Sequence, residues 1–325
     1  MKAAFFSNGT DWAVDPHIVD RVYAHGRRDK IAELVELVPE IITSENFETQ
    51  LEQIWDIDVI FSTWHMLELS NTQLDKLPNL KAVFYAAGAT QYFRQPFLDR
   101  GIVVCSASAA NAIPVAEFAL SQTLLAGSGY FRNSRECIDR WHTEVPNSFQ
   151  GHGNYDGRVS ILGNGAISNH LQRLLSHHDL DMVVVPSRAE NRTVSLEEAF
   201  ATSFAVVNLF PDRDDNAGVF NEPLFASMMD SAVFINVGRG RQVNEADLIH
   251  VMKLRPDLTA LLDVQWPEPP VDGSELYSLP NIQLSAHIAG STASEYIRMA
   301  DYMIEDFQRF ERGESLLHCV LPDQL

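Results

Sequence analysis

The sequence is poor in cysteine, with only Cys105, Cys137 and Cys319 among its 325 residues. They lie far apart, and none belongs to a Cys-x-x-Cys pair or a Cys/His cluster. This scarcity excludes a disulfide-stapled secreted scaffold and gives no support for a zinc site, because both need closely or regularly spaced cysteines. A reduced, intracellular protein without a bound metal is the simplest interpretation.

Positive charge is also scarce. The chain has 24 lysines and arginines against 44 aspartates and glutamates, which gives a formal net charge of -20. Nucleic-acid binding needs clustered basic residues, and docking on anionic membranes needs them as well, so neither class of partner is expected. The acidity itself favours solubility. A site for an anionic ligand must therefore be built from a few locally placed positive groups.

Long apolar runs are missing too. No stretch reaches the roughly 18 apolar residues of a membrane-spanning helix, and residues 1–12 turn polar too soon for a signal peptide. A cytoplasmic location is therefore expected. With 46% hydrophobic and 21% charged residues, the composition is that of a soluble globular protein with room for two domains.

Two series of strand-length apolar runs alternate with segments of helical period, which predicts βαβ units. The first series has helices between its strands, for example at 47–55 and 92–100. Its predicted strands are Lys2–Phe6, Asp58–Ser62, Lys81–Ala86 and Ile102–Cys105. A long helix over 111–130 and a polar loop over 141–156 follow.

The second series starts with a strand, a Gly-rich turn and a helix over 166–176. Ser195 and Asn244 are expected to cap later helices, Ser195 in a capping box with Glu198. The predicted strands are Arg158–Leu162, Met182–Val185, Ala205–Leu209, Ala232–Asn236, Leu258–Asp263 and Ile282–Ser285. From Ser291 to about Arg312 the tail again has helical period.

The turn at Gly163-Asn164-Gly165 follows a predicted strand and opens a helix. In a dinucleotide fingerprint, small residues at this point let backbone N–H groups approach a pyrophosphate. The third glycine is replaced by Ser168, which is still small. A Gly-rich turn without any ligand is the alternative, because the motif alone is weak.

The next strand ends in Pro186-Ser187-Arg188. An NAD site usually has an acidic residue here for the ribose hydroxyl, and that carboxylate would repel a 2′-phosphate. Serine and arginine can instead bind a 2′-phosphate through charge-assisted hydrogen bonds, so NADP(H) is favoured and NAD(H) remains possible. The alternative is that Arg188 and Arg192 are ordinary solvated arginines.

Three further strand ends carry polar residues with catalytic potential. Arg239 lies between two glycines, and its guanidinium group could bind a carboxylate through two parallel hydrogen bonds. Asp263 ends a strand, and Glu268 follows it in a proline-rich loop. His287 ends the last strand, and a histidine paired with a carboxylate is a good acid–base unit. Each of these residues taken singly is more often structural.

Together these residues resemble the D-isomer-specific 2-hydroxyacid dehydrogenase family, in particular its glyoxylate and hydroxypyruvate reductases. The resemblance covers most of the chain, including residues 80–88, 115–120 and 158–290. The Arg239–Glu268 interval of 29 residues and the Glu268–His287 interval of 19 also match that family. The combination is far more specific than the glycine motif.

The resemblance implies a role for each matching residue. Arg239 would bind the substrate carboxylate and polarise the keto oxygen. His287 would donate and accept the proton, with Glu268 as its partner. Backbone amides of Ala87 and Gly88 would also hold the substrate carboxylate. Cofactor-binding positions would be Gly163, Asn164, Gly165, Ala166, Ile167, Ser187, Arg188, Pro211, Val237, Gly238, Asp263, His287 and Gly290, with Asp263 accepting from the cofactor carboxamide.

The same resemblance implies two Rossmann-like or flavodoxin-like parallel-sheet domains. A dinucleotide-binding domain, residues 105–290, would be inserted into a discontinuous substrate domain, residues 1–104 plus 291–325. The protein would be a homodimer with the helix around 115–130 at its interface. Its reaction would be hydride transfer between NADP(H) or NAD(H) and a small 2-keto or D-2-hydroxy acid such as glyoxylate or hydroxypyruvate.

Several positions depart from the family pattern, and Thr90, Gln265 and Trp266 could alter the substrate pocket. A formate dehydrogenase would have glutamine in place of Glu268. The main alternative is a dinucleotide-binding scaffold of the corepressor type with little catalysis, because a fold does not dictate its function.

Overall fold

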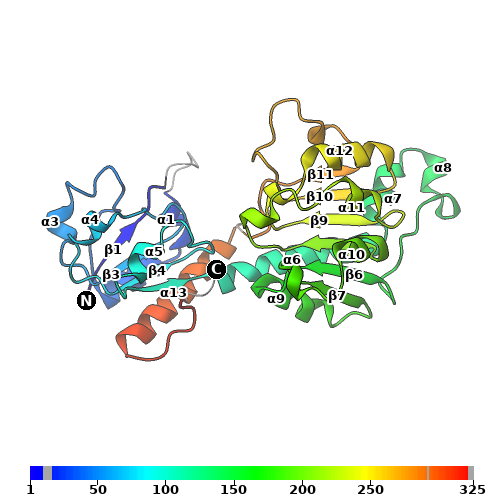
Figure 1. Cartoon of the computed structure of the whole chain (residues 1–325). Coiled ribbons are helices and arrows are strands. Elements are labelled where there is room, and N and C mark those ends of the chain that lie inside the picture. Colours follow the sequence, from blue (N-terminus) through cyan, green and yellow to red (C-terminus); the bar gives the residue numbers. More distant parts are fainter. Residues whose placement is uncertain (10–16, 291–292, 321–325) are drawn as a thin grey trace. The chain divides into compact units, whose positions relative to one another are not determined.

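The computed structural model describes residues 1–9, 17–290 and 293–320. The chain divides into two compact units, of which the first joins Met1–Asn111 to Ser291–Leu325 and the second is Ala112–Gly290. Each unit has its own parallel sheet covered by helices (Figure 1). The boundary predicted at 104/105 lies a few residues earlier than this division, inside strand β5.

The sheet of the first unit has five parallel strands among the described residues, in the order β2-β1-β3-β4-β5. This order is that of a flavodoxin-like doubly wound fold. The strands are β1 Lys2–Phe6, β2 Glu36–Leu37, β3 Val59–Ser62, β4 Ala82–Tyr85 and β5 Val103–Ser106. The helices are α1 Ile18–Val22, α2 Arg27–Leu34, α3 Leu51–Ile54, α4 Asn71–Leu74, α5 Gln95–Leu98 and α13 Glu295–Glu311.

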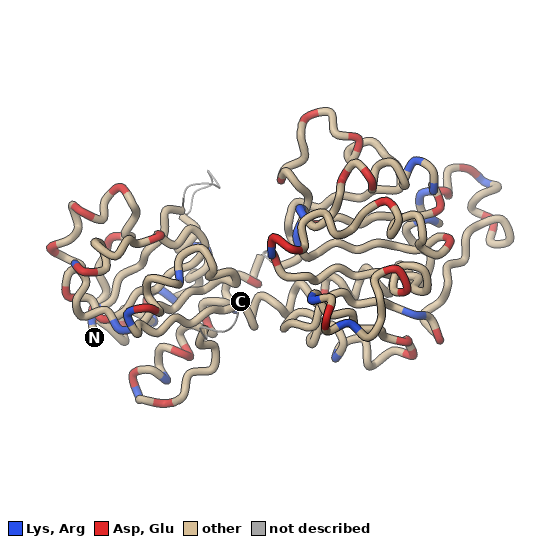
Figure 2. The backbone as a smooth tube through the Cα atoms, in the orientation of Figure 1, with Lys and Arg blue, Asp and Glu red and all other residues tan. Residues whose placement is uncertain are grey.

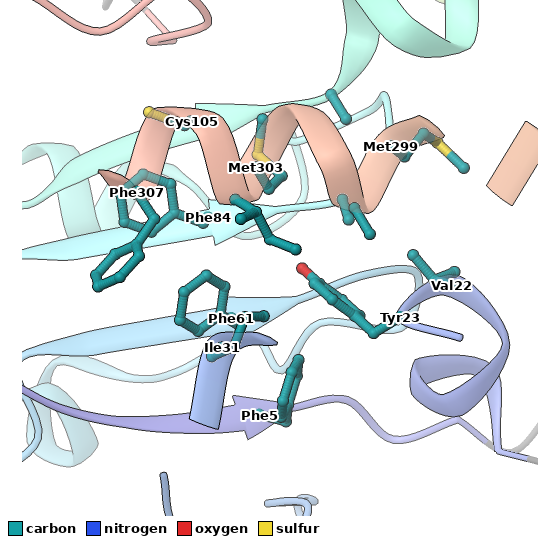
Figure 3. Close-up of a cluster of buried hydrophobic side chains, with 14 of the residues drawn as sticks. Phe5, Val22, Tyr23, Ile31, Phe61, Phe84, Cys105, Met299, Met303 and Phe307 are labelled. Atoms are coloured by element: carbon teal, nitrogen blue, oxygen red, sulfur yellow. The ribbon is translucent and has the colours of Figure 1, made fainter. Parts of the chain in front are cut away.

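Helix α13, from the far end of the chain, completes one face of this sheet. Its buried side chains pack with those of α1 and α2 on the strands (Figure 3). The ring of Phe307 lies 5.2 Å from that of Phe61, and the Tyr23 hydroxyl donates to the Ser62 carbonyl at 3.1 Å. Helices α3, α4 and α5 cover the opposite face. The first unit therefore needs both ends of the sequence to bury its sheet.

The sheet of the second unit has six parallel strands in the described chain, in the order β11-β10-β9-β8-β6-β7. They are β6 Arg158–Leu162, β7 Asp181–Val185, β8 Ala205–Asn208, β9 Val233–Asn236, β10 Thr259–Leu262 and β11 Ile282–Leu284. One face is covered by α6 Ser108–Gly127, α7 Tyr130–Glu136 and α9 Ala166–Leu175. The other is covered by α10 Leu196–Thr202, α11 Glu222–Ala226 and α12 Glu245–Leu254. A short helix, α8 Arg140–Thr143, lies in the connecting segment.

The architecture of two parallel α/β domains is confirmed, and the predicted strands match the observed ones closely. Helices at 47–55 and 92–100 are shorter than predicted, since turns precede α3 and α5. Helix α13 starts at Glu295, and residues 291–292 of the predicted tail helix lie outside the described residues. Ser195 and Asn244 cap α10 and α12, each accepting a hydrogen bond from a backbone N–H. Of the predicted capping box, the described hydrogen bonds contain only the one that Ser195 accepts from the Glu198 N–H.

Acidic residues occur along the backbone of both units (Figure 2), and in the whole chain 44 aspartates and glutamates stand against 24 lysines and arginines. Within the residues that the structure describes, no helix combines the length and the apolar character needed to cross a membrane.

Candidate active site

Five neighbouring strands in the second unit end in register at their carboxyl ends. The register pairs Leu162 with Asn208, Asn208 with Asn236, Asn236 with Leu262, and Leu262 with Leu284. In open parallel sheets, ligands bind at this edge because the loops that follow the strands meet there. The predicted residues of this unit lie at these strand ends, at the end of β7, whose Val185 pairs with Leu162, or in the loops that follow; Ala166 and Ile167 lie in the first turn of α9.

The turn after β6 is shaped for close approach of a ligand. Gly163 has a φ of 121°, and a Cβ there would lie 2.8 Å from the Leu209 carbonyl oxygen, so a side chain does not fit. Gly165 precedes α9, and no side chain caps that helix start. Its N–H groups are therefore open to an anion. Ser168, at the position of the missing glycine, is buried and accepts a hydrogen bond from Gln172 at 3.0 Å.

The turn after β7 is held by arginines. Arg192 donates to the carbonyls of Pro186 at 2.9 Å and Ser187 at 2.8 Å, and lies over the ring of Phe210. It is therefore a structural brace, and the interpretation of Arg192 as a solvated surface group is wrong. Arg188 is exposed, which agrees with both interpretations of this residue.

Arg213 joins this turn from the loop after β8, which sequence reasoning missed. Its Nη1 donates to the Ser187 hydroxyl at 3.1 Å, and its other two nitrogens pair with Asp215 at 2.8 and 2.9 Å. The hydrogen bond from Arg213, reinforced by the charge of Arg188, lowers the pKa of the Asp215 carboxyl below its usual value. No local sequence signal links Ser187 to a residue 26 positions away.

Three fully buried amide side chains join the ends of β8 and β9 to the turn that follows β9. Asn208 donates to Asn236 at 2.8 Å and to Gln242 at 2.7 Å. Gln242 donates in turn to the Pro211 carbonyl at 2.8 Å. Because unpaired buried amides are costly, this network strongly favours a single conformation of the turn.

Arg239 sits in that turn, half-buried, and its backbone N–H donates to Gln242 Oε1 at 3.1 Å. Its guanidinium Nη1 donates to the Gly238 carbonyl at 2.7 Å. A Cβ on Gly240 would overlap the carbonyl group of Gln265, so glycine is required after the arginine. The turn presents one guanidinium group at the ligand-binding edge, with donors left for a carboxylate.

Asp263 is almost completely buried and fixes the loop that carries His287. Its Oδ1 accepts from the Ser285 hydroxyl at 2.6 Å and the Ile288 N–H at 2.9 Å, and its Oδ2 accepts from the Ala289 N–H at 3.0 Å. These bonds hold His287 in a left-handed conformation with a φ of 53°. A carboxylate offers about four acceptor positions, so one remains for a cofactor amide, the role that stays predicted for Asp263.

His287 and Glu268 form the hydrogen-bonded pair anticipated from the sequence. His287 Nδ1 lies 2.7 Å from Glu268 Oε1, and their side chains are 48% and 36% exposed. With Nδ1 occupied, Nε2 is the ring nitrogen available to another group. Gln265 donates to the carbonyls of Leu262 at 2.8 Å and Ser285 at 3.4 Å, and thereby links the two strand ends that precede this pair.

The first unit carries the remaining predicted residues, Ala87 and Gly88, just after β4. The Ser106 hydroxyl lies 3.0 Å from the Ala87 carbonyl and 2.9 Å from that of Gly88, which anchors the turn. Asn111 lies beside it, because a Cβ on Gly88 would be 3.7 Å from Asn111 Nδ2. The Oδ1 atom of Asn111 is buried without a hydrogen-bond partner. Asn111 was not singled out from the sequence. Thr90 is buried and accepts from Arg94.

The other predicted cofactor positions, Pro211, Val237, Gly238 and Gly290, follow β8, β9 and β11. In residues 1–9, 17–290 and 293–320, no group of three or more metal-ligating side chains could hold an ion.

The profile of the family described as "D-isomer specific 2-hydroxyacid dehydrogenase, NAD binding domain" matches residues 124–289, just over half of the chain. The chain belongs to this family. It is 27% identical over 285 residues to the glyoxylate reductase of Pyrococcus furiosus, which covers 82% of this chain and 83% of the relative. It is 26% identical over 231 residues to the D-3-phosphoglycerate dehydrogenase of Archaeoglobus fulgidus.

Coverage of some relatives is partial. The match spans 43% of that phosphoglycerate dehydrogenase and 59% of YoaD of Bacillus subtilis, which is 29% identical over 205 residues. Among solved structures, D-mandelate dehydrogenase of Rhodotorula graminis has a TM-score of 0.76 at 20% identity, covering 98% of this chain and 97% of that one. A glyoxylate reductase from Paecilomyes thermophila has a TM-score of 0.73 at 21% identity, covering 100% and 99%. At such identities these structures establish the shared fold.

Replacing Asp263 by alanine tests whether this carboxylate holds the His287 loop. The change leaves three donors without an acceptor, so we expect the free energy of unfolding to fall by about 3 kcal/mol. Amide hydrogen exchange at Ile288 and Ala289 should accelerate at least tenfold, since roughly 1.4 kcal/mol of local stability corresponds to a factor of ten. Asp272→Asn, at an exposed position, is the control. Unchanged exchange at both amides would show that the loop is held by other contacts.

Proposed function

We propose that this protein is a nicotinamide-dependent oxidoreductase that interconverts a small 2-keto acid and a D-2-hydroxy acid. The observation that carries the proposal is the His287–Glu268 hydrogen bond of 2.7 Å at the ligand-binding edge of the sheet. Membership in the 2-hydroxyacid dehydrogenase family supports the same reaction class. The small-residue turn at Gly163 and the uncapped start of α9 fit a dinucleotide pyrophosphate.

The roles proposed for the residues follow from their geometry. When bound, a nicotinamide dinucleotide supplies or accepts the hydride. Glu268 holds Nδ1 of His287, so that Nε2 delivers a proton to the reduced keto oxygen and takes it back in the reverse direction. Arg239 binds the substrate carboxylate and stabilises the negative charge that develops on the neighbouring oxygen. A substrate-binding role is also proposed for the backbone amides at Ala87 and Gly88.

For the substrate we propose glyoxylate or hydroxypyruvate. Similarity to the glyoxylate reductase of Pyrococcus furiosus supports this choice. The pocket is expected to differ in detail, because Trp266, beside Glu268 in the chain, has a side chain that is 65% exposed. No nucleic acid or membrane partner is proposed, and a cytoplasmic location stays a prediction from the sequence.

Oxidation of NADPH or NADH, followed at 340 nm with a panel of 2-keto acids, tests the reaction. His287→Ala should lower kcat about 10³-fold, because general acid–base catalysis contributes 10²–10⁴-fold. Glu268→Gln should lower it less, since a neutral amide can still orient the ring. Both variants should still bind the dinucleotide, as measured by calorimetry.

His250→Ala is the matched control, because His250 is exposed on α12 and also lies near a glutamate, Glu222, at 3.8 Å. Turnover that survives in His287→Ala would refute the catalytic role. If no 2-keto acid is reduced while the dinucleotide binds tightly, a dinucleotide-binding scaffold would become the better account.

NADP(H) is proposed as the preferred cofactor. Ser187, Arg188 and Arg213 place one hydroxyl and two guanidinium groups at the turn where the ribose of a bound dinucleotide would lie. These groups can form charge-assisted bonds with a 2′-phosphate. The Asp215 carboxylate accepts hydrogen bonds from two guanidinium nitrogens of Arg213, so it would compete with a 2′-phosphate for these donors.

Binding of adenosine 2′,5′-bisphosphate and of adenosine 5′-monophosphate tests this cofactor preference without catalysis. Arg213→Gln should weaken the bisphosphate about tenfold, as expected for one charged hydrogen bond, and leave the monophosphate unchanged. Asp215→Asn should strengthen the bisphosphate because it removes the competing carboxylate. Arg140→Gln, whose side chain is 96% exposed, is the control. Equal affinity of the native protein for both nucleotides would overturn the preference.

A homodimer is also proposed. From the last turn of α6 to the start of β6, six large apolar residues are 40% to 79% exposed: Leu125, Tyr130, Ile138, Trp141, Val145 and Tyr155. So many exposed apolar groups in one segment mark a protein–protein contact. A second copy of the chain is the partner we propose, because the family resemblance implies dimers formed near this segment.

Light scattering after size-exclusion chromatography tests the dimer. Ile138→Asp combined with Trp141→Asp should convert a dimer into monomers, because each charge would be buried without a partner at the interface. Leu254→Asp is the matched control, since Leu254 is 66% exposed outside this segment. A monomeric native protein would refute the proposal.

A further inference from the structure

Cys105 and Cys319 meet in the first unit although 214 positions separate them in the sequence. Their sulfur atoms are 3.7 Å apart. Cys105 is buried in β5, at the apolar cluster beneath α13 (Figure 3). Cys319 lies in the C-terminal tail, is partly exposed, and packs against the same cluster. The proposed hydride transfer uses neither thiol.

The backbone around the two cysteines has the geometry of a cross-strand pair. The tail bridges β5 in antiparallel fashion at Cys105 and Cys319. The Ser106 N–H donates to the His318 carbonyl at 3.0 Å, and the Val320 N–H donates to the Val104 carbonyl at 2.8 Å. The cysteines are therefore directly opposite each other in a non-hydrogen-bonded pair. The Cα atoms of such pairs are about 4.5 Å apart, within the range that a disulfide can span.

A buried carboxylate fixes the tail in this position. Asp306 of α13 is fully buried and accepts from the N–H groups of Leu317 at 2.8 Å and His318 at 3.0 Å. It also contacts the His318 ring nitrogen Nδ1 at 3.0 Å. Since neighbouring residues 317 and 318 are tied to α13, the thiol of Cys319 is held beside β5 rather than sampling many positions.

The two thiols differ in exposure and in the direction of their pKa shifts. Their mutual hydrogen bond, together with burial, raises the pKa of Cys105, and the same hydrogen bond lowers the pKa of Cys319. Among the facing groups, the Asp306 carboxylate opposes the charge on Cys319, and His318 favours it. Thiolate character and exposure both favour attack at Cys319, with Cys105 as the group that resolves the product.

We propose that Cys105 and Cys319 form an oxidant-sensitive dithiol, a site of reversible modification by low-molecular-weight disulfides. The Cys319 thiolate attacks one sulfur of the small disulfide, whose S–S bond breaks and releases one thiolate. Cys105 then gives up its proton and attacks the Cys319 sulfur, which releases the second small thiol. The protein loses two electrons and two protons, and the small disulfide gains both as two thiols.

Oxidation would draw the sulfur atoms from 3.7 Å to about 2.05 Å and tie the tail covalently to β5. The next residue, Ser106, anchors the carbonyls of Ala87 and Gly88. The dithiol is therefore coupled to the turn proposed to hold the substrate carboxylate. This functional consequence rests on the proposed function, whereas the disulfide itself does not.

The test uses the full chain incubated with glutathione disulfide, followed by intact-mass and peptide mass spectrometry. We expect a loss of about 2 Da, a Cys105–Cys319 cross-linked peptide, and full reversal by dithiothreitol. The oxidised form should also unfold at a temperature roughly 5 °C or more above that of the reduced form. The KM for the keto acid should change while dinucleotide affinity does not.

Cys319→Ser should abolish the mass loss, and so should Cys105→Ala. Cys137→Ser should oxidise like the native chain, because Cys137 lies in the second unit and its sulfur contacts Asn133 and the His142 carbonyl. Three titratable thiols after oxidation would overturn the proposal, and so would a stable adduct on Cys319 or a disulfide involving Cys137. If the disulfide forms but the reduced protein reduces no 2-keto acid, only the proposed function is refuted.

Discussion

The in-register alignment of parallel strands is the constraint on which the site depends. Because Leu162, Asn208, Asn236, Leu262 and Leu284 are paired across the sheet, the loops after five strands begin at one edge. Residues more than a hundred positions apart in the sequence can then serve one ligand. A one-residue slip in any strand would turn its side chains to the opposite face, and the buried packing on both faces opposes such a slip.

Buried polar groups fix the positions of the functional side chains at this edge of the sheet. The amides of Asn208, Asn236 and Gln242 fix the turn of Arg239, and the Asp263 carboxylate fixes the loop of His287. The three amides are fully buried and the carboxylate is almost fully buried. A buried polar group left without a hydrogen-bond partner costs about 1–3 kcal/mol of stability. Alternative loop conformations would break these bonds, so they are disfavoured. The exposed His287–Glu268 pair can therefore be aligned by groups that never touch a substrate.

Sequence patterns predicted most strands and the His287–Glu268 pairing, because both are local or family-wide signals. They missed β2, which has only two residues, and α8, which overlaps the segment predicted as a loop over 141–156. Apolar runs of four or five residues bounded by glycine or polar residues gave strands such as β1 and β6. The short helices α3 and α5 were overestimated, since turns share their helical spacing with true helices. Arg213 was missed because its partner Ser187 lies 26 positions away, and Asn111 was missed because only the fold brings it beside Gly88. The structural role of Arg192 was not predicted for a different reason. Its hydrogen-bond partners are backbone carbonyls, and a side-chain motif does not indicate these.

The discontinuity of the first unit gives its C-terminal tail an unusual position. Helix α13 completes the core of a sheet whose strands lie some two hundred residues earlier in the sequence. Asp306 of this helix accepts hydrogen bonds from Leu317 and His318 and so holds the tail beside β5. A bond between Cys105 and Cys319 would close a loop that contains the whole second unit. Such a loop restricts the unfolded chain more than a short one, but only modestly, because the entropy of closure rises with the logarithm of loop length. Any covalent change at this bridge therefore acts on the stability of the first unit and on the turn beside Ser106 together, because β5 carries both.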